Sequence, residues 1–297
     1  MSSKHEKLYL IYILWLLVFI FLTNQYYDFK EIVSINQTDS ISYMTIAKFA
    51  PEYSSEIMPY HHAQRVFIPY LIGLISKTLN VNPFLIFRIF TYLAILIIVI
   101  LHYLITKILK IDIYFSILSI SLLILNPYLV RYFLAVPTMV NDVFFILSIY
   151  LFLLAMMTKK NYMLFGVTLS LISRQNGIFL FISHIFYRII DNKHKFFKDK
   201  NLIFSFFLIL ILSSIANNYA AKVSGSSFNF THVYGIFTWV INEFDFSYFI
   251  KWIMLPLYSY LPLIFIFLTY RKISIFDNKN LKQFFILIFI FLSIVGV

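Results

Sequence analysis

Two side chains with acid–base chemistry stand four residues apart in a polar stretch of an otherwise apolar chain. Asp39 and Tyr43 belong to the segment 38–43, which follows the first long apolar run. A second carboxylate, Asp142, lies far along the chain. An aspartate can take a proton from a hydroxyl group or bind a divalent metal ion. We therefore expect Asp39 and Asp142 to be the catalytic carboxylates of one site.

Arginines accompany these carboxylates, and three of them are our candidates for binding a substrate phosphate: Arg65, Arg88 and Arg174. A guanidinium offers planar donors that match phosphate oxygens. An ionisable residue at membrane depth costs about 2.5–3.5 kcal/mol on insertion scales, so each needs a partner or a function. Arg174 is the hardest to explain otherwise, because it lies in the middle of an apolar segment.

Polar neighbours of these residues are candidates for positioning a substrate: Tyr43, His61, His62, Gln64, Asn141 and Gln175. Alternatives without function stay open for several residues. Asp39 can be explained as a loop residue or as a helix N-cap. Asp142 can be explained as the cap of a helix that starts at Val143, and Arg88 as a side chain that extends to the membrane interface. The adjacent histidines His61 and His62 can be explained as ordinary surface residues or as metal ligands. We therefore expect no certain cofactor and keep a divalent metal as an alternative.

Composition places these residues in a membrane protein. The chain is 61% hydrophobic and only 12% charged, and long apolar runs recur along it. The fold class we predict is all-α, a polytopic bundle of membrane-spanning helices. The net charge of +11 belongs mostly to loops, where basic residues set orientation, so we expect no nucleic-acid partner. The chain has no cysteine, which excludes disulfides and thiol chemistry.

Basic residues indicate the order of the helices. Lys4 and Lys7 place the N-terminus in the cytoplasm, so a first uncleaved helix at 8–23 leads to an outer loop at 24–83. Within that loop we expect an interfacial helix near 41–49 and a second helix at 66–79. The second would reach only about 21 Å, too short for a comfortable span. The following spans are predicted at 84–106, 113–130 and 143–157.

The segment 162–190 is apolar except for a polar centre at 173–177, and basic residues flank both of its ends. Two short helices hinged at Asn176 and Gly177 keep both basic ends in the cytoplasm, as the distribution of basic loops requires. This topology puts Arg174 at the outer tip of a hairpin. It also brings Asp39, Asp142, Arg65, Arg88, Arg131 and Arg174 to one membrane level.

Further spans are predicted at 202–219, at 248–268 and from 283 onward, where the apolar run continues to residue 297 as in a chain cut within a helix. We divide the chain into a module at 1–190 and C-terminal helices at 191–297. The expected location is the bacterial inner (plasma) membrane, with several passes.

Five features in this order resemble the GT-C superfamily of integral-membrane glycosyltransferases, which includes protein O-mannosyltransferases, aminoarabinose transferases and oligosaccharyltransferases. They are an acidic residue and a tyrosine after the first helix, a basic residue with a proline opening a surface helix, an arginine at the next helix, a proline-rich loop ending in aspartate, and a hairpin bearing a basic residue. This chain carries them as Asp39 and Tyr43, the run 64–71, Arg88, Pro127 with Pro137 and Asp142, and Gly166 with 173–177.

The resemblance covers residues 8–190 and implies an inverting transferase that moves a sugar from a polyprenyl-phosphate donor to a lipid, glycan or protein hydroxyl. It implies that Asp39 orients or deprotonates the acceptor while Arg65 and Arg174 hold the leaving phosphate. Ser40 stands where the superfamily usually has a second acidic residue, which weakens the case for a two-carboxylate metal. The alternatives are a transporter or flippase of lipid-linked sugars and a non-catalytic membrane subunit. Sugar, acceptor, linkage and oligomeric state are not determined by the residues.

Overall fold

The computed structural model describes residues 3–23, 30–125, 130–158, 163–175, 177–178, 180–182, 184–185 and 200–225. Within these ranges the chain is all-α and contains no strand. The described elements are α1 (Ser3–Thr23), α2 (Lys30–Phe49), α3 (Tyr60–Ala63), α4 (Phe67–Leu79), α5 (Pro83–Ile108), α6 (Ile113–Leu125), α7 (Val130–Ala135), the 3-10 helix η1 (Pro137–Met139), α8 (Val140–Thr158), α9 (Met163–Ser173) and α11 (Lys200–Ser224). The predicted spans at 248–268 and from 283 lie outside the described residues.

Local sequence signals place the helix ends around the polar region. Asn80 ends α4 in the left-handed conformation, with φ 54°. Asn82 then caps α5 by accepting a hydrogen bond from the amide of Phe84, and Pro83 occupies the first turn. Pro137 opens η1, which leads directly into α8 at Val140. Asp142 therefore lies inside the first turn of α8, and the predicted start of that helix at Val143 was three residues too late.

Three described helices are long and apolar enough to cross a membrane: Pro83–Ile108, Pro137–Ala155 and Ile203–Ser224. Large apolar side chains remain exposed on α5 and α11, as expected for surfaces that meet lipid. The predicted helices at 84–106 and 202–219 are confirmed. The segment 66–79 is confirmed as a short helix, whereas part of the predicted span at 113–130 lies outside the described residues.

The predicted reversal after α9 is confirmed by contacts on both sides of the turn. The amide of Gly177 donates to the carbonyl of Arg174, and a Cβ at Gly177 would come within 2.4 Å of the Ser170 carbonyl. Further on, the His184 ring lies 5.8 Å from that of Phe152. Gly166 of α9 also packs against the backbone of Phe152. Because Gly166 and His184 share this neighbour, the chain at His184 runs back alongside α9.

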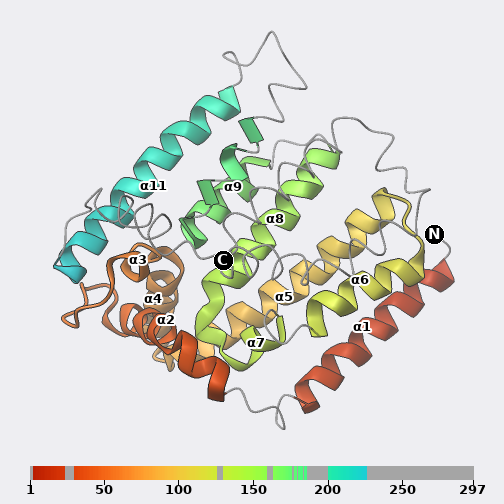
Figure 1. Cartoon of the computed structure of the whole chain (residues 1–297), viewed down its shortest axis with the longest axis horizontal. Helices are drawn as coiled ribbons and strands as arrows, with labels where there is room; N and C mark the ends of the chain where they lie inside the picture. Colours follow the sequence, from red (N-terminus) through yellow and green to blue (C-terminus); the bar gives the residue numbers. More distant parts are fainter. Residues whose placement is uncertain are drawn as a thin grey trace, which may run out of the picture. The chain divides into compact units, whose positions relative to one another are not determined.

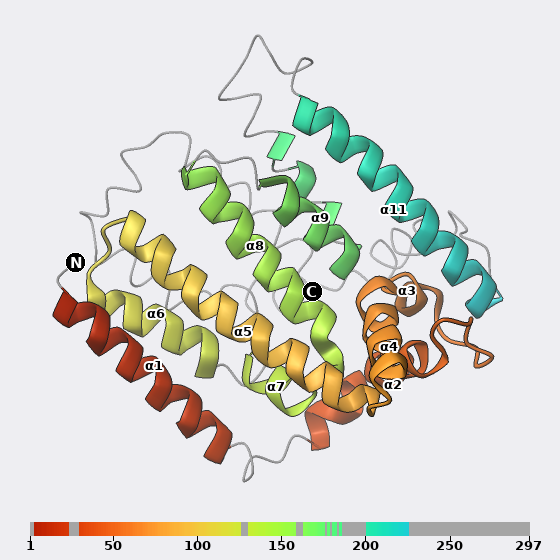
Figure 2. The ribbon, with the colours of Figure 1, turned by 180° about the vertical axis from the view of Figure 1, so that it is seen from behind.

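The first polar loop is more helical than predicted, because α2 begins at Lys30 rather than near residue 41. α2 contacts α3, α4, α5 and η1, and α3 contacts α11. Figures 1 and 2 show α2, α3 and α4 gathered at the end of the bundle where α5 and α8 begin and α11 ends. This end is where the polar candidates meet.

Close packing of α4 on α2 depends on Gly73. A Cβ at this position would lie 2.2 Å from the carbonyl oxygen of Ala47, so no side chain fits. The contact seats α4, and with it Arg65 just before α4, against the helix that carries Asp39.

We expect Gly73→Ala to separate α2 from α4 and to destabilise the protein by about 1–3 kcal/mol, as overpacking does. The measurement is the thermal unfolding midpoint of the purified protein in detergent. Leu71→Ala is the matched control, since Leu71 lies on the same helix with 48% of its surface exposed. Equal midpoints for Gly73→Ala and the unmodified protein would contradict the packing.

Candidate functional site

A partly buried cluster of charged and amide side chains forms where α2, α3, α8 and the end of α9 meet. It brings together both predicted carboxylates and two of the predicted arginines. His62 and Arg65 pair with Asp39, and Arg174 pairs with Asp142. The site residues come from sequence positions more than a hundred residues apart, so the helix packing described above is what assembles them.

Asp39 is held by partners on both carboxylate oxygens. His62 Nε2 lies 2.5 Å from Oδ1, and Arg65 donates from NH1 to Oδ2 at 2.9 Å. Burial raises the pKa of Asp39, but the hydrogen bond from His62 and the charge of Arg65 outweigh that effect and lower the pKa below its ordinary value. Asp39 is therefore ionised at neutral pH, although 21% of its side chain is exposed.

Arg65 contacts three separate parts of the fold. Its NH1 donates to Asp39 and, at 2.6 Å, to the Tyr43 hydroxyl, while its Nε donates to Gln175 Oε1 at 3.1 Å. Its backbone carbonyl accepts from Asn141 Nδ2. Burial lowers the pKa of Arg65, but Tyr43 and the charges of Asp142 and Asp39 outweigh burial and raise it. The guanidinium is thus fixed and charged.

Tyr43 reaches Asp39 because four residues make one helical turn on α2. Its buried hydroxyl accepts from Arg65 and lies 3.4 Å from Asp39 Oδ2, to which it donates. Burial raises the pKa of Tyr43 well above its ordinary value, so it acts as a neutral hydrogen-bonding group. The predicted positioning role of Tyr43 agrees with this placement.

Asp142 and Arg174 form the second ion pair, between Oδ1 and NH1. Several polar atoms beside it lack hydrogen-bond partners among the described residues, although they are buried: both oxygens of Asp142, Nε of Arg174 and Oδ1 of Asn141. The ion pair is thus a charge contact without an aligned hydrogen bond. Buried polar atoms are almost always satisfied, so this group indicates a place for a polar ligand.

An amide chain continues the site toward α11. Gln175 Nε2 donates to Gln64 Oε1 and to the carbonyl of His61, and Gln64 Nε2 donates to Asn217 Oδ1 at 2.6 Å. Tyr60 also donates to Asn217. Asn217 was missed by sequence reasoning; the signal was the Asn217–Asn218 pair inside an apolar helix.

Two other predicted arginines take different positions. Arg88 is exposed on α5, with its guanidinium 5.2 Å from the centre of the Phe84 ring, and the structure does not bring it into the cluster. It lies on an exposed face of α5, and the apolar residues on all sides of this helix gave no indication of which face is exposed. Arg131 lies half-buried in α7.

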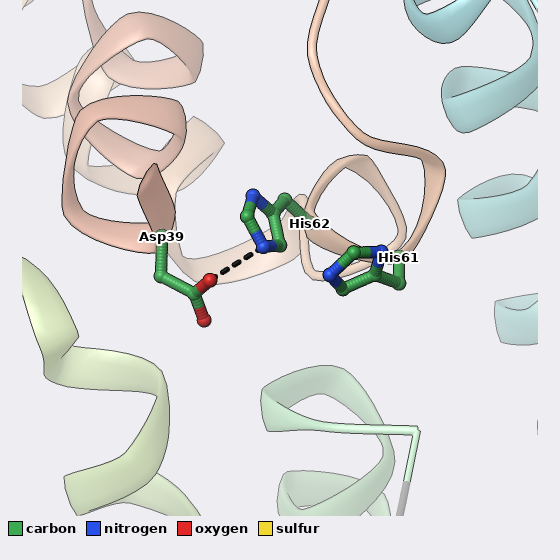
Figure 3. A group of neighbouring side chains, drawn as sticks. All are labelled: Asp39, His61 and His62. Carbon is green, nitrogen blue, oxygen red and sulfur yellow. Dashed lines mark ion pairs between the residues drawn. The ribbon is translucent and has the colours of Figure 1, made fainter. Parts of the chain in front are cut away.

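One part of the cluster has the composition of a metal site. Asp39, His61 and His62 each offer a ligand atom, and these atoms lie within 4.8 Å of one another. Figure 3 shows the carboxylate of Asp39 turned toward the His62 ring, with the His61 ring beside it. His61 is exposed and His62 is buried, so the group lies at the edge of the buried cluster.

Comparisons with known proteins give no match for this chain among family models, curated proteins or solved structures.

We expect a double-mutant cycle on Asp142→Ala and Arg174→Ala to show a coupling of about 1–3 kcal/mol in the free energy of unfolding. Each single change leaves a partly buried charge unpaired, while the double change removes both. The control cycle joins Asp142→Ala to Arg88→Ala, which should be additive within about 0.5 kcal/mol. Additivity in the first cycle would show that the ion pair is absent.

Proposed function

We propose that the protein is a membrane glycosyltransferase that moves a sugar from a polyprenyl-phosphate donor to an acceptor hydroxyl. The observation that supports this most is the group of buried polar atoms at Asn141, Asp142 and Arg174 that have no hydrogen-bond partner within the described part of the chain. It combines acceptors for a hydroxyl with a guanidinium donor for a phosphate. Such a pairing at the end of membrane-spanning helices suits a substrate whose phosphate lies at the lipid surface.

The donor phosphate would bind between Arg65 and Arg174. Arg174 is the more accessible of the two, with 31% of its side chain exposed, and its Nε has no acceptor among the described residues. A phosphate that accepts a hydrogen bond from Nε of Arg174 competes with Asp142 for the Arg174 guanidinium. The exchange leaves a carboxylate oxygen able to receive a hydrogen bond from the acceptor.

Asp39 is the proposed proton acceptor, and donor binding would prepare it for that role. Arg65 is one cause of the low pKa of Asp39. When the phosphate draws on the same guanidinium, Asp39 loses part of that interaction and its pKa rises toward the ordinary value. A carboxylate with a higher pKa is a stronger general base at neutral pH.

The transfer is a displacement with inversion at the anomeric carbon. The acceptor oxygen forms a bond to that carbon, the bond from carbon to phosphate oxygen breaks, and the acceptor proton goes to Asp39. The electron pair leaves on the phosphate, where Arg65 and Arg174 stabilise the added charge. Fixed donors in a water-poor site are the larger contribution to such a step. Tyr43, Gln64, Gln175 and Asn217 hold these groups in place.

We place the protein in the bacterial inner membrane with several passes, the N-terminus in the cytoplasm and the site at the outer face. The basic segments at 159–160 and 193–200 would then be cytoplasmic. The reversal at Gly177 agrees with this topology, because it lets the chain enter and leave the hairpin at the same end.

Asp39→Asn should reduce transfer by about 10²–10⁴-fold, the usual contribution of a general base. Arg174→Lys should retain more activity than Arg174→Ala, because lysine keeps the charge but loses the planar donors. The measurement is turnover of a panel of polyprenyl-phosphate sugars by the protein in liposomes, with unfolding midpoints checked for each variant.

Arg88→Ala is the matched control for the arginine variants, since Arg88 lies outside the cluster and should leave turnover unchanged. Wild-type-like turnover in Asp39→Asn, with loss in Arg174→Ala, would assign the base to another residue. Passage of intact lipid-linked sugar across the bilayer without transfer would instead establish a flippase.

Because the chain has no cysteine, single cysteines report its orientation directly. In sealed right-side-out vesicles, we expect a membrane-impermeant maleimide to label Ile57→Cys, since Ile57 is 84% exposed beside the site. Lys195→Cys should react only after the vesicles are permeabilised. Labelling of Lys195→Cys in sealed vesicles would overturn the proposed orientation.

A further inference from the structure

We propose that Asp39, His61 and His62 form a binding site for a single Zn²⁺ ion. The carboxylate and the two imidazoles place their ligand atoms within 4.8 Å of one another. This proposal concerns metal binding and does not depend on glycosyl transfer, so it can hold even where the proposed activity fails. Zinc takes Oδ1 of Asp39, so zinc binding would compete with the proposed role of Asp39 as proton acceptor.

Two of the three ligands, Asp39 and His62, are held by outer hydrogen bonds of the kind found in metal centres. Arg65 holds Oδ2 of Asp39 at 2.9 Å, which leaves Oδ1 to bind an ion. Ser42 Oγ lies 3.0 Å from Nδ1 of His62, which leaves Nε2 to bind. Such outer hydrogen bonds fix the orientation of ligating carboxylates and histidines. The two remaining atoms, Oδ1 and Nε2, are the pair that face each other at 2.5 Å.

Binding requires only small movements of these side chains. Ligand atoms about 2.0–2.2 Å from a tetrahedral zinc ion lie about 3.3 Å apart, so Oδ1 and Nε2 must separate by somewhat less than 1 Å. His61 is exposed and its ring lies 4.2 Å from that of His62, centre to centre, at an angle of 72°. Rotation of the His61 side chain brings its nitrogen to the shared position, where Figure 3 shows the three groups adjacent.

The ligand types select the ion. Two imidazole nitrogens and one carboxylate oxygen suit Zn²⁺, whereas Mg²⁺ and Ca²⁺ prefer oxygen alone. Three protein ligands leave one position for water, a hydroxyl or a phosphate oxygen, which is the arrangement of catalytic zinc sites.

The test is equilibrium dialysis of the full-length protein, without a histidine tag and stripped with a chelator, against Zn²⁺ alone. Metal bound per chain is read by plasma emission spectrometry. We expect one zinc per chain at micromolar or lower concentration, and at least about a tenfold loss of affinity in His61→Ala. Ser42→Ala should weaken binding by about 10–100-fold, as expected for an outer hydrogen-bond partner.

His194→Ala is the matched control, a histidine deletion outside the described residues. It should bind zinc as the unmodified protein does. His61 is exposed, so its variant should fold and keep the test decisive if His62→Ala does not. Unchanged zinc affinity in His61→Ala, or no binding by the unmodified protein, would overturn the site.

Discussion

The half-buried guanidinium of Arg65 holds the other groups of the site together. It joins α2 through Asp39 and Tyr43 and the end of α9 through Gln175, while the backbone carbonyl of Arg65 accepts a hydrogen bond from the Asn141 amide of α8. A charged group this far from water is tolerated only where its hydrogen bonds and charge are met. The helix packing must therefore keep these partners in place, and Gly73 permits it by letting α4 approach α2 closely.

The two ion pairs differ in a way that suggests a division of roles. Asp39 and Arg65 are engaged by several neighbours, so that pair is a fixed scaffold. Asp142 and Arg174 have one charge contact and unused hydrogen-bonding atoms among the described residues. A ligand that brings both donors and acceptors can exchange with the second pair and draw on Arg65, while the other partners of Asp39 and Arg65 keep the first pair in place. This arrangement favours a phosphate with a neighbouring hydroxyl, the combination found when a lipid-linked sugar meets its acceptor.

The sequence allowed prediction of the helices and the hairpin because apolar runs, prolines and basic loops mark them locally. It also singled out Asp39 and Tyr43, and their spacing of four brings them together because α2 is helical over both residues. Which side of a helix faces the cluster was harder to predict. Arg65 and Arg88 looked equivalent in the sequence, yet of these two only Arg65 enters the cluster, because packing between distant segments decides which side chains are enclosed. Asn217 was missed for the same reason, as its contact with Gln64 joins distant segments.

We propose that this cluster recognises the phosphate of a polyprenyl lipid. Binding of a polyprenyl phosphate can be compared with that of the matching polyprenol by native mass spectrometry of the purified protein. The two lipids share the same chain, so the difference reports the phosphate alone. We expect the protein to bind the phosphate and to retain little of the alcohol, with the difference lost in Arg174→Ala. Equal binding of both lipids would show that the cluster does not recognise the phosphate.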